Sequence, residues 1–406
     1  MVKYISFGKL DKKFVIMNLF AIFFTIISLI IERKNEGFYE KNKFMNLVGI
    51  NFGLFLSFIP ELIRNRSNSY KRSNSKPYTT KFYILLIIMT ALLNLIHNIL
   101  ISLIKGINEE EIRFLQNNNL SFLIIITFFI STLIFKYSYY RHQYLSIVII
   151  TLLILFRHLI KIFKTSKYAV EKDKLIIFFC FHIIGLICLS LYIIYLKILF
   201  EKYYFSLYKV TYLIGVINGI IVIIIYIIIS FKPIEKNNIF GTVEYEGKYY
   251  FDNINSFFNG YNLGEIILYF IYYVINSIRD FIMINIIIEN YSINYIFLPF
   301  NVISILVNII EIFKFYDFEI SLICLLIFSF FCEIISICVY LEIIELNFCG
   351  LSENINKNIK KRALEDSKIT SDPMNNMFEI NNQYLVNYDD VIEKENEDKK
   401  AELKDI

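Results

Sequence analysis

The chain has 406 residues, of which 56% are hydrophobic and 17% aromatic, and it contains only 13 Gly and 5 Pro. Because so few turn-forming residues accompany so much apolar mass, the composition excludes a soluble globular protein and predicts long helices in a membrane. The formal net charge of +4 is small for this length, and Lys and Arg are spread over short polar stretches, so nothing indicates nucleic-acid binding.

Apolar runs long enough to cross a bilayer recur along the chain. A hydrocarbon core about 30 Å thick takes roughly 20 apolar residues as a helix. Such runs lie near 14–31, 45–63, 82–104, 120–138, 144–160, 175–196, 210–231, 264–289, 293–313 and 319–344. The first run lacks a small-residue cleavage site after it, which favours a retained helix over a signal peptide. We therefore predict an all-α polytopic membrane protein of about ten transmembrane helices.

Polar segments mark the ends of the chain and its largest loop. Slightly more Lys and Arg fall on the side that a cytoplasmic N-terminus shares, so we expect residues 1–13 to be cytoplasmic and the insertion 232–263 to be external. Residues 352–406 cannot bury enough apolar area to fold alone, and we expect a disordered cytoplasmic tail. The expected location is an endomembrane (Golgi, ER or vacuole) or the plasma membrane, and a glycosylation sequon at Asn119 agrees with a secretory-pathway membrane.

Two pairs of similar sequences suggest an internal duplication. The GxxxG units, each with an Asn between its glycines, are formed by Gly49 and Gly53 in the second run and by Gly215 and Gly219 in the seventh. We expect these glycines to allow close helix packing. Similar polar patches also occur in the third and eighth runs. We predict two inverted five-helix repeats, 14–160 and 175–344, because an odd number of helices per repeat reverses the second one; chance similarity is the alternative.

The two polar patches are the candidate substrate site. They consist of Asn94, His97 and Asn98 in the third run and of Asn276, Arg279 and Asp280 in the eighth. Residues three and four apart share a helix face, so each set forms one patch. Ionisable groups in hydrocarbon cost roughly 2.5 to 3.5 kcal/mol each and usually face a bundle interior. We expect both patches to face a common cavity; an internal network that sets helix register is the alternative.

Neighbouring helical residues point roughly 100° apart, so Arg279 and Asp280 are expected to engage other groups rather than only each other. His97 is either a proton-coupling group or a hydrogen-bonded core residue. Glu333, near the middle of the tenth run, either couples ion movement or pairs with another residue. Arg157 and His158 lie near the end of the fifth run, where snorkelling to the interface explains them.

Sequence signatures of enzymes are missing. The chain has no HExxH, no Gly-rich phosphate loop and no GxSxG, and its His spacing assembles no metal triad. The six cysteines have no CxxC spacing, so we expect them to pack rather than to bind metal. We predict a non-enzyme without cofactor or metal. Its expected partners are the lipid bilayer and a small-molecule substrate, with a homodimer as the candidate assembly.

Three stretches, together with the plan of ten runs, carry a family resemblance. The basic turn 136–143, the segment 196–219 and the ending 346–358 resemble the drug/metabolite transporter superfamily, in particular its solute-carrier branch related to nucleotide-sugar transporters. The resemblance implies a secondary transporter whose third, fourth, eighth and ninth helices surround a central cavity. The FYNN and GALNK motifs of GDP-mannose-type carriers are absent, so the resemblance transfers no substrate.

The combined expectation is a secondary transporter that moves a small polar metabolite, such as a nucleotide sugar or another organic anion, by alternating access. In this hypothesis Arg279 binds an anionic or carbonyl group, and Asp280 orients it or balances its charge. Asn94, Asn98 and Asn276 hydrogen-bond the polar body of the substrate. The alternatives are a channel and a non-transporting membrane adaptor whose C-terminal tail recruits partners.

Overall fold

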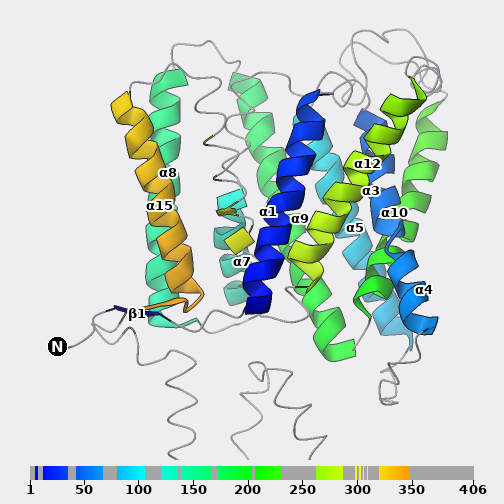
Figure 1. Ribbon diagram of the computed structural model, residues 1–406, viewed down its shortest axis with the longest axis horizontal. Helices are drawn as coiled ribbons and strands as arrows, with labels where there is room; N and C mark the ends of the chain where they lie inside the picture. Colours follow the sequence, from blue (N-terminus) through cyan, green and yellow to red (C-terminus); the bar gives the residue numbers. More distant parts are fainter. Residues whose placement is uncertain are drawn as a thin grey trace, which may run out of the picture.

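The computed structural model describes most of the hydrophobic part of the chain. The described residues are 5–7, 12–34, 43–66, 80–105, 120–135, 139–165, 172–203, 206–230, 262–286, 298–299, 301–302, 305, 309, 320–346 and 351. Within these ranges the chain is almost entirely helical, and the helices stand side by side (Figure 1). Six helical stretches are long and apolar enough to cross a membrane, namely Met45–Ile63, Phe82–Leu103, Phe179–Phe200, Leu207–Ile228, Leu263–Met283 and Ile320–Tyr340. The chain is therefore a helical multi-pass membrane protein.

The first half of the chain contains a broken helix. Its elements are α1 (Lys12–Lys34), α3 (Lys43–Phe55), α4 (Phe58–Arg66), α5 (Thr80–Lys105), α7 (Leu120–Leu133) and α8 (Arg141–Thr165). The break between α3 and α4 has a local cause, because Pro60 has no N–H to donate to the Leu56 carbonyl and its ring crowds the preceding turn. The Leu56 carbonyl accepts instead from the backbone N–H of Ile59, at 3.0 Å, and the Ser57 hydroxyl donates to the carbonyl of Leu54 at 2.7 Å. The predicted run 45–63 is thus two helices joined at a kink.

The second half contains one irregular helix. Its elements are α9 (Lys172–Tyr203), α10 (Leu207–Ser230), α12 (Leu263–Asp280), the π-helix η2 (Phe281–Ile286) and α15 (Ile320–Tyr340). Helix α12 starts with a capping contact, in which the backbone N–H of Asn262 donates to the Glu265 carboxylate at 2.9 Å. The π-helical turn η2 follows directly after Asp280. Such turns interrupt α-helices frequently at functional sites.

The predicted run 319–344 is too long at its C-terminal end. Helix α15 stops at Tyr340, and Glu342 adopts a left-handed backbone conformation with φ of 60°. The backbone N–H of Ile343 donates to the carbonyl of Cys338 at 2.9 Å, which is the six-residue closure that terminates many helices. The run 120–138 is also too long, since α7 ends at Leu133.

Other predictions fall on parts of the chain that the structure does not describe. The tail 352–406 lies entirely outside the described residues, and so does the insertion 232–263 except for its last two residues, where α12 begins. The ninth run, 293–313, lies largely outside them. The predicted count of ten helices therefore stays a prediction.

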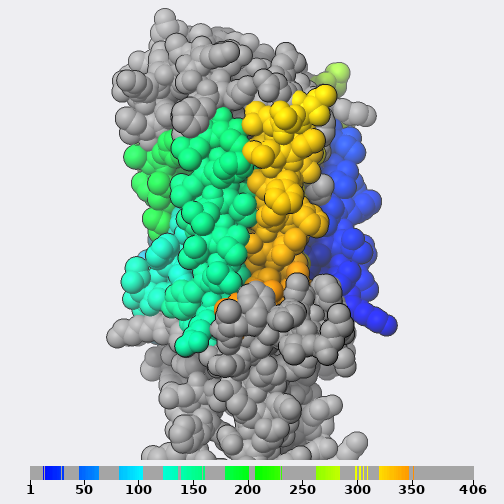
Figure 2. All heavy atoms as spheres, turned by 90° about the vertical axis from the view of Figure 1, so that its left-hand side faces the viewer, coloured from blue at the N-terminus to red at the C-terminus, as the bar shows by residue number. Residues whose placement is uncertain are grey.

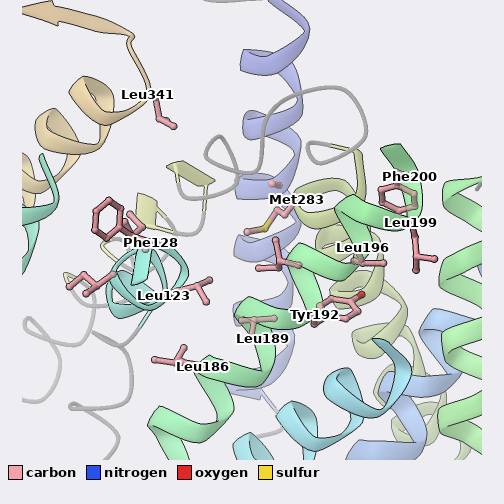
Figure 3. Packing of buried hydrophobic residues seen from close by; sticks show 14 of the residues in the cluster. Leu123, Phe128, Leu186, Leu189, Tyr192, Leu196, Leu199, Phe200, Met283 and Leu341 are labelled. Carbon is pink, nitrogen blue, oxygen red and sulfur yellow. The ribbon is translucent and has the colours of Figure 1, made fainter. Parts of the chain in front are cut away.

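Helix α9 occupies the centre of the bundle. It packs along α5 on one side and α7 on the other, and α7 leads through α8 to α15. On the far side of α5, α10 packs against α3, which packs against α12, and α12 packs against α1. Figure 2 shows α8 and α15 side by side at one end of this arrangement. Figure 3 shows part of the shared core, where α9 residues such as Leu189 and Leu196 gather with Phe128 of α7 and Met283 of η2.

The glycines of the two GxxxG units lie in different surroundings. A Cβ atom added at Gly53 would lie 2.9 Å from the backbone oxygen of Tyr273 and closer still to Ser277, so α3 and α12 touch along this face. A Cβ atom added at Gly215 would lie 2.7 Å from the backbone nitrogen of Phe55. Gly219, one turn further along α10, has nothing within 4 Å of such an atom.

The two ends of the helical region meet in a small sheet. Strand β1 (Ile5–Phe7) pairs antiparallel with β2 (Ile344–Leu346), with Ser6 opposite Glu345. The predicted N-terminal segment 1–13 therefore contributes a strand that contacts the end of α15. The two ends of the helical region therefore lie on the same side of the bundle.

Pairing of the two strands predicts a specific disulfide. Cysteines introduced as Ser6→Cys and Glu345→Cys, with the native cysteines replaced, are expected to cross-link on mild oxidation because directly paired strand residues lie within disulfide reach. After proteolysis at a site engineered into 232–261, the two fragments should remain joined on a non-reducing gel. Each single-cysteine variant is a control and should give separated fragments. Separated fragments from the double-cysteine variant would contradict the pairing.

Candidate functional site

The patch on α5 is held together by one side-chain oxygen. The Asn94 carbonyl oxygen accepts a hydrogen bond from the Asn98 amide at 3.0 Å and another from the Asn218 amide of α10 at 3.2 Å. Asn94 is buried and Asn218 is fully buried. The sequence had identified Asn218 only as the residue between two packing glycines. Its contact with Asn94 depends on how α5 and α10 pack.

His97 is fixed by the neighbouring helix. Its Nδ1 lies 2.8 Å from the carbonyl oxygen of Gly185 on α9, so Nδ1 carries the proton in this contact and donates it. A Cβ atom added at Gly185 would lie 3.8 Å from Nδ1, an ordinary van der Waals distance, so the contact does not depend on the missing side chain. The neutral ring then presents Nε2 as an acceptor, and a role in proton coupling stays a prediction.

Three asparagines come together where α3, α5 and α10 meet. Leu47, Leu95 and Val222, one from each helix, form a small apolar cluster at this junction. Asn51 lies one turn from Leu47, Asn94 adjoins Leu95, and Asn218 lies one turn from Val222. The side-chain oxygens of Asn51 and Asn218 have no hydrogen-bond partner within the described part of the chain. Buried amide oxygens are normally satisfied, so this junction can accept hydrogen bonds from a further group.

The contacts of the α12 patch include one to another helix and one within the patch. The side-chain oxygen of Asn276 accepts a hydrogen bond from the Ser28 hydroxyl of α1 at 2.8 Å. Arg279 contacts Asp280 directly, with Nε at 2.8 Å and Nη2 at 2.7 Å from the same carboxylate oxygen. The two neighbours contact each other because the long Arg side chain folds back across the angle between the two Cα–Cβ bonds, and Arg279 also takes part in a further interaction, so Asp280 is not its sole partner.

Helix α12 has a lipid-facing stripe of exposed apolar residues and, on another face, a protein-facing stripe of tyrosine and polar residues. Ile267, Ile271 and Ile278 are large, exposed and apolar, and their spacing places them on one face of the helix. Tyr269, Tyr273, Asn276 and Asp280 recur three or four residues apart on another face. The two tyrosines are buried, yet the Asp280 side chain, at the end of the same stripe, is 43% exposed.

The helices that carry the two patches meet through α9. His97 of α5 contacts the α9 backbone at Gly185, and Met283, three residues after Asp280, packs in the same apolar cluster as the buried Tyr192 of α9. Helices α5, α9 and α12 thus direct polar side chains toward a common region of the bundle. The binding role of these residues remains a prediction, but the fold brings together groups that lie far apart in the sequence.

A second charged pair lies between α8 and α15. Nη2 of Arg157 is 2.6 Å from the Glu333 carboxylate, and the two side chains are 1% and 0% exposed. Arg157 also lies over the Phe330 ring, 4.6 Å from its centroid, and 3.4 Å from the Ser329 hydroxyl. The snorkelling interpretation of Arg157 was wrong, because its charge is met by a carboxylate inside the protein rather than by water at the interface. Glu333 has the paired environment that was one of its two expected roles.

Polar contacts also gather where α15 ends. Nε2 of His142, in the first turn of α8, lies 3.5 Å from the Glu342 carboxylate. The Ser131 hydroxyl of α7 and the Tyr139 hydroxyl are 2.5 Å apart. These contacts lie near the β1–β2 pair and tie α7, α8 and α15 together at that end. Sequence reasoning missed both: His142 and Glu342 come from distant parts of the chain, whereas Ser131 and Tyr139 are only eight residues apart.

The described residues contain no group of three His, Cys, Asp or Glu side chains arranged to hold a metal ion. A comparison of the chain with protein-family models finds no match, and neither does a comparison with curated proteins. The resemblance to the drug/metabolite transporter superfamily therefore carries no more weight than the sequence stretches that suggested it.

Proposed function

We propose that this protein is a secondary transporter that moves a small polar metabolite by alternating access, with two inverted five-helix repeats rocking around a site formed by α5, α9, α10 and α12. The observation that carries the proposal is the pattern of helix contacts. Substrate and coupling-ion sites of such transporters lie near the bilayer midplane between repeats.

The pattern of contacts between helices stays the same when each helix of one proposed repeat is replaced by its counterpart in the other repeat. The exchange replaces α1 by α9, α3 by α10, α5 by α12 and α8 by α15. Under it the α5–α9 contact becomes α12–α1 and the α3–α12 contact becomes α10–α5, and all four contacts are present. The α3–α10 and α8–α15 contacts map onto themselves and are also present. Short connections favour packing between consecutive helices, so connectivity alone does not require this symmetry.

Three further contacts test the exchange: one agrees with it, one differs, and the α7–α9 contact maps onto α1 and the ninth run, most of which lies outside the described residues. The α7–α8 contact maps onto a contact between the ninth run and α15, where Ile305 clusters with Leu326 and Phe330. The α3–α5 contact has no counterpart of similar extent between α10 and α12 in the described residues. Figure 1 shows α1 and α12, which contact each other across the repeats, crossing the bundle side by side.

Polar groups concentrate where the exchange-related helices meet. Asn94, Asn218, His97 and Asp280 come from both halves of the chain, and all lie within helices that the bilayer would surround. Buried ionisable groups of this kind mark substrate and ion pathways in membrane proteins. A channel or an adaptor explains the helices equally well, but neither requires polar groups to converge from two symmetric halves.

Thiol labelling tests the proposal without knowledge of a substrate. Single cysteines replace Asn98 and Asn276, both half-buried, in a background without native cysteines, and Ile278→Cys on the lipid-facing stripe of α12 serves as the control. In sealed vesicles we expect a membrane-impermeant reagent to reach positions 98 and 276 from both sides, but not position 278.

The disulfide between β1 and β2 turns this labelling into a test of alternation. The two strands flank helices of different repeats, so joining them through Ser6→Cys and Glu345→Cys should hold the protein closed on their side. Oxidation is then expected to abolish labelling from that side and preserve it from the other. Labelling from both sides that does not change when the disulfide forms favours a channel. No labelling from either side favours an adaptor.

A further inference from the structure

Helices α3 and α10 run antiparallel and bring two buried asparagines to the same height in the bundle. At one point Leu47 of α3 clusters with Val222 of α10. Two turns away, a Cβ atom added at Gly215 of α10 would lie 2.7 Å from the backbone nitrogen of Phe55 of α3. The residues midway between these two contacts are Asn51 on α3 and Asn218 on α10.

Asn94 of α5 joins these two residues in a layer that lies between apolar residues. It accepts a hydrogen bond from the Asn218 amide at 3.2 Å, and all three side chains are more than nine-tenths buried. The apolar residues on one side are Leu47, Leu95 and Val222. Those on the other side are Leu54, Ala91 and Ile214. We call Asn51, Asn94 and Asn218 the asparagine layer.

The asparagine layer contains acceptor atoms that its own contacts do not use. The Asn51 amide donates to the Leu47 carbonyl at 2.8 Å, and the Asn218 amide donates to Asn94. The side-chain oxygens of Asn51 and Asn218 accept no hydrogen bond from the described residues. A layer that only set the register of the helices would pair these oxygens, because an unpaired buried acceptor destabilises the fold. The two oxygens therefore indicate a ligand.

Charged side chains of the same helices lie at a distance from the layer. On α3, α4, α5 and α10, the ones that the structure describes are Glu61 and Lys209. Lys209 lies nine residues before Asn218, and nine helical residues span about 13 Å. The Glu61 carboxylate accepts a hydrogen bond from Ser206, which lies still further from Asn218 along the chain. Neither charge is part of the layer.

The neighbouring helices also hold their charges elsewhere. On α9, Lys197 lies twelve residues after Gly185, the residue that His97 of α5 contacts, and twelve helical residues span about 18 Å. On α12, which packs against α3, Arg279 and Asp280 carry opposite charges and contact each other. The asparagine layer is therefore a site made of uncharged oxygens.

We propose, on the basis of the transporter function above, that the asparagine layer binds an alkali-metal cation, Na⁺ or K⁺, as the coupling ion. Carbonyl oxygens replace the hydration shell of such ions inside membrane proteins. Protein sites for Ca²⁺ and Mg²⁺ rely on carboxylates, which the layer lacks, and amides do not titrate as a proton carrier must.

The position of the layer agrees with this role. The α3–α10 contact maps onto itself when the two proposed repeats are exchanged, so the layer lies where the repeats meet. Coupling ions of secondary transporters bind at such an interface, where a rocking motion can open the site to either side. Each of the two unpaired oxygens comes from a different repeat, so the bound ion contacts both.

Direct binding of tracer ions to the purified full chain tests the inference. The probes are radioactive sodium and, as a tracer for K⁺, radioactive rubidium, with N-methyl-D-glucamine keeping the ionic strength constant. We expect saturable binding of at least one of the two ions. The melting temperature should rise by about 2 to 4 °C as that ion saturates its site, and N-methyl-D-glucamine should give no such rise.

Leucine variants of the asparagines locate the ion. Asn51→Leu and Asn218→Leu keep a similar size, and each should lower the affinity for the ion at least about tenfold. Asn18→Leu on α1 is the matched control. The Asn18 amide also donates to a carbonyl one turn earlier, at 2.8 Å, and its oxygen also lacks a partner among the described residues. This variant should bind the ion as the unaltered chain does, and monodisperse elution of each variant checks its folding.

The outcomes separate this inference from the transporter proposal. Binding of neither ion by the unaltered chain overturns the inference and leaves water as the occupant of the layer. Binding that persists in both layer variants also overturns it, because the ion then lies elsewhere. Thiol labelling at position 276 that is the same with and without the bound ion overturns the coupling role. The labelling itself needs no ion, so the transporter proposal stands or falls on that experiment alone.

Discussion

Replacement of Arg157 by Met is expected to destabilise the protein by about 3 to 5 kcal/mol, because it leaves Glu333 fully buried without its counter-charge. Glu333→Leu should cost a similar amount by leaving Arg157 unpaired. The contact of Arg157 with the Phe330 ring adds to the loss in the first variant. Survival of solubilised protein after heating, followed by size-exclusion chromatography, measures the effect.

The double variant Arg157→Met/Glu333→Leu distinguishes a charge effect from a packing effect. Since it removes both charges and keeps similar volume, we expect it to recover most of the stability that either single variant loses. His142→Gln, which breaks the more distant contact with Glu342, is the comparison and should cost far less. Additive losses in the double variant would show that the pair contributes packing rather than charge compensation.

Gly215→Ala and Gly219→Ala form a matched pair on one helix with opposite expected results. The Cβ atom at position 215 meets the α3 backbone at Phe55, which cannot rotate away, so we expect overpacking to cost about 1 to 3 kcal/mol. The Cβ atom at position 219 meets open space, and Ala is the better helix former, so a gain of up to about 1 kcal/mol is expected.

The same heating assay measures both glycine variants. Gly53→Ala provides a third point, since its Cβ atom meets the backbone of α12 at Tyr273 and should also destabilise. Equal effects at positions 215 and 219 would mean that α10 does not approach α3 as closely as the structure has it. The expected difference also shows that a GxxxG spacing alone does not identify which of its glycines lies at a helix contact.

The two charged pairs lie in different environments, so we expect them to have different roles. Arg157–Glu333 is fully buried between α8 and α15, so we expect it to hold those helices together. Arg279–Asp280 is partly exposed and adjoins a π-helical turn. The exposure of the second pair, and not its composition, makes it the better candidate for contact with the substrate of the proposed transporter.

Much of the helical framework follows from the sequence. Long apolar runs interrupted by short polar stretches predict helices and a membrane, since an unpaired backbone is not tolerated in hydrocarbon. The break at Pro60 is also a local effect. Helix ends are less predictable: the apolar residues after Tyr340 leave α15 because their backbone turns toward β1, and the partner strand lies more than three hundred residues away.

The sequence by itself determined that the protein is a multi-pass helical membrane protein and that polar groups on α5 and α12 are unusual, because both properties depend on composition and on spacing within one helix. Only the tertiary structure decided the partners of these groups. In the structure Asn218 donates a hydrogen bond to Asn94, His97 contacts the α9 backbone, and Arg157 forms an ion pair with Glu333. Each of these contacts joins helices that are distant in sequence, and the physical reason is that a buried charge or amide takes the partner that helix packing brings to it.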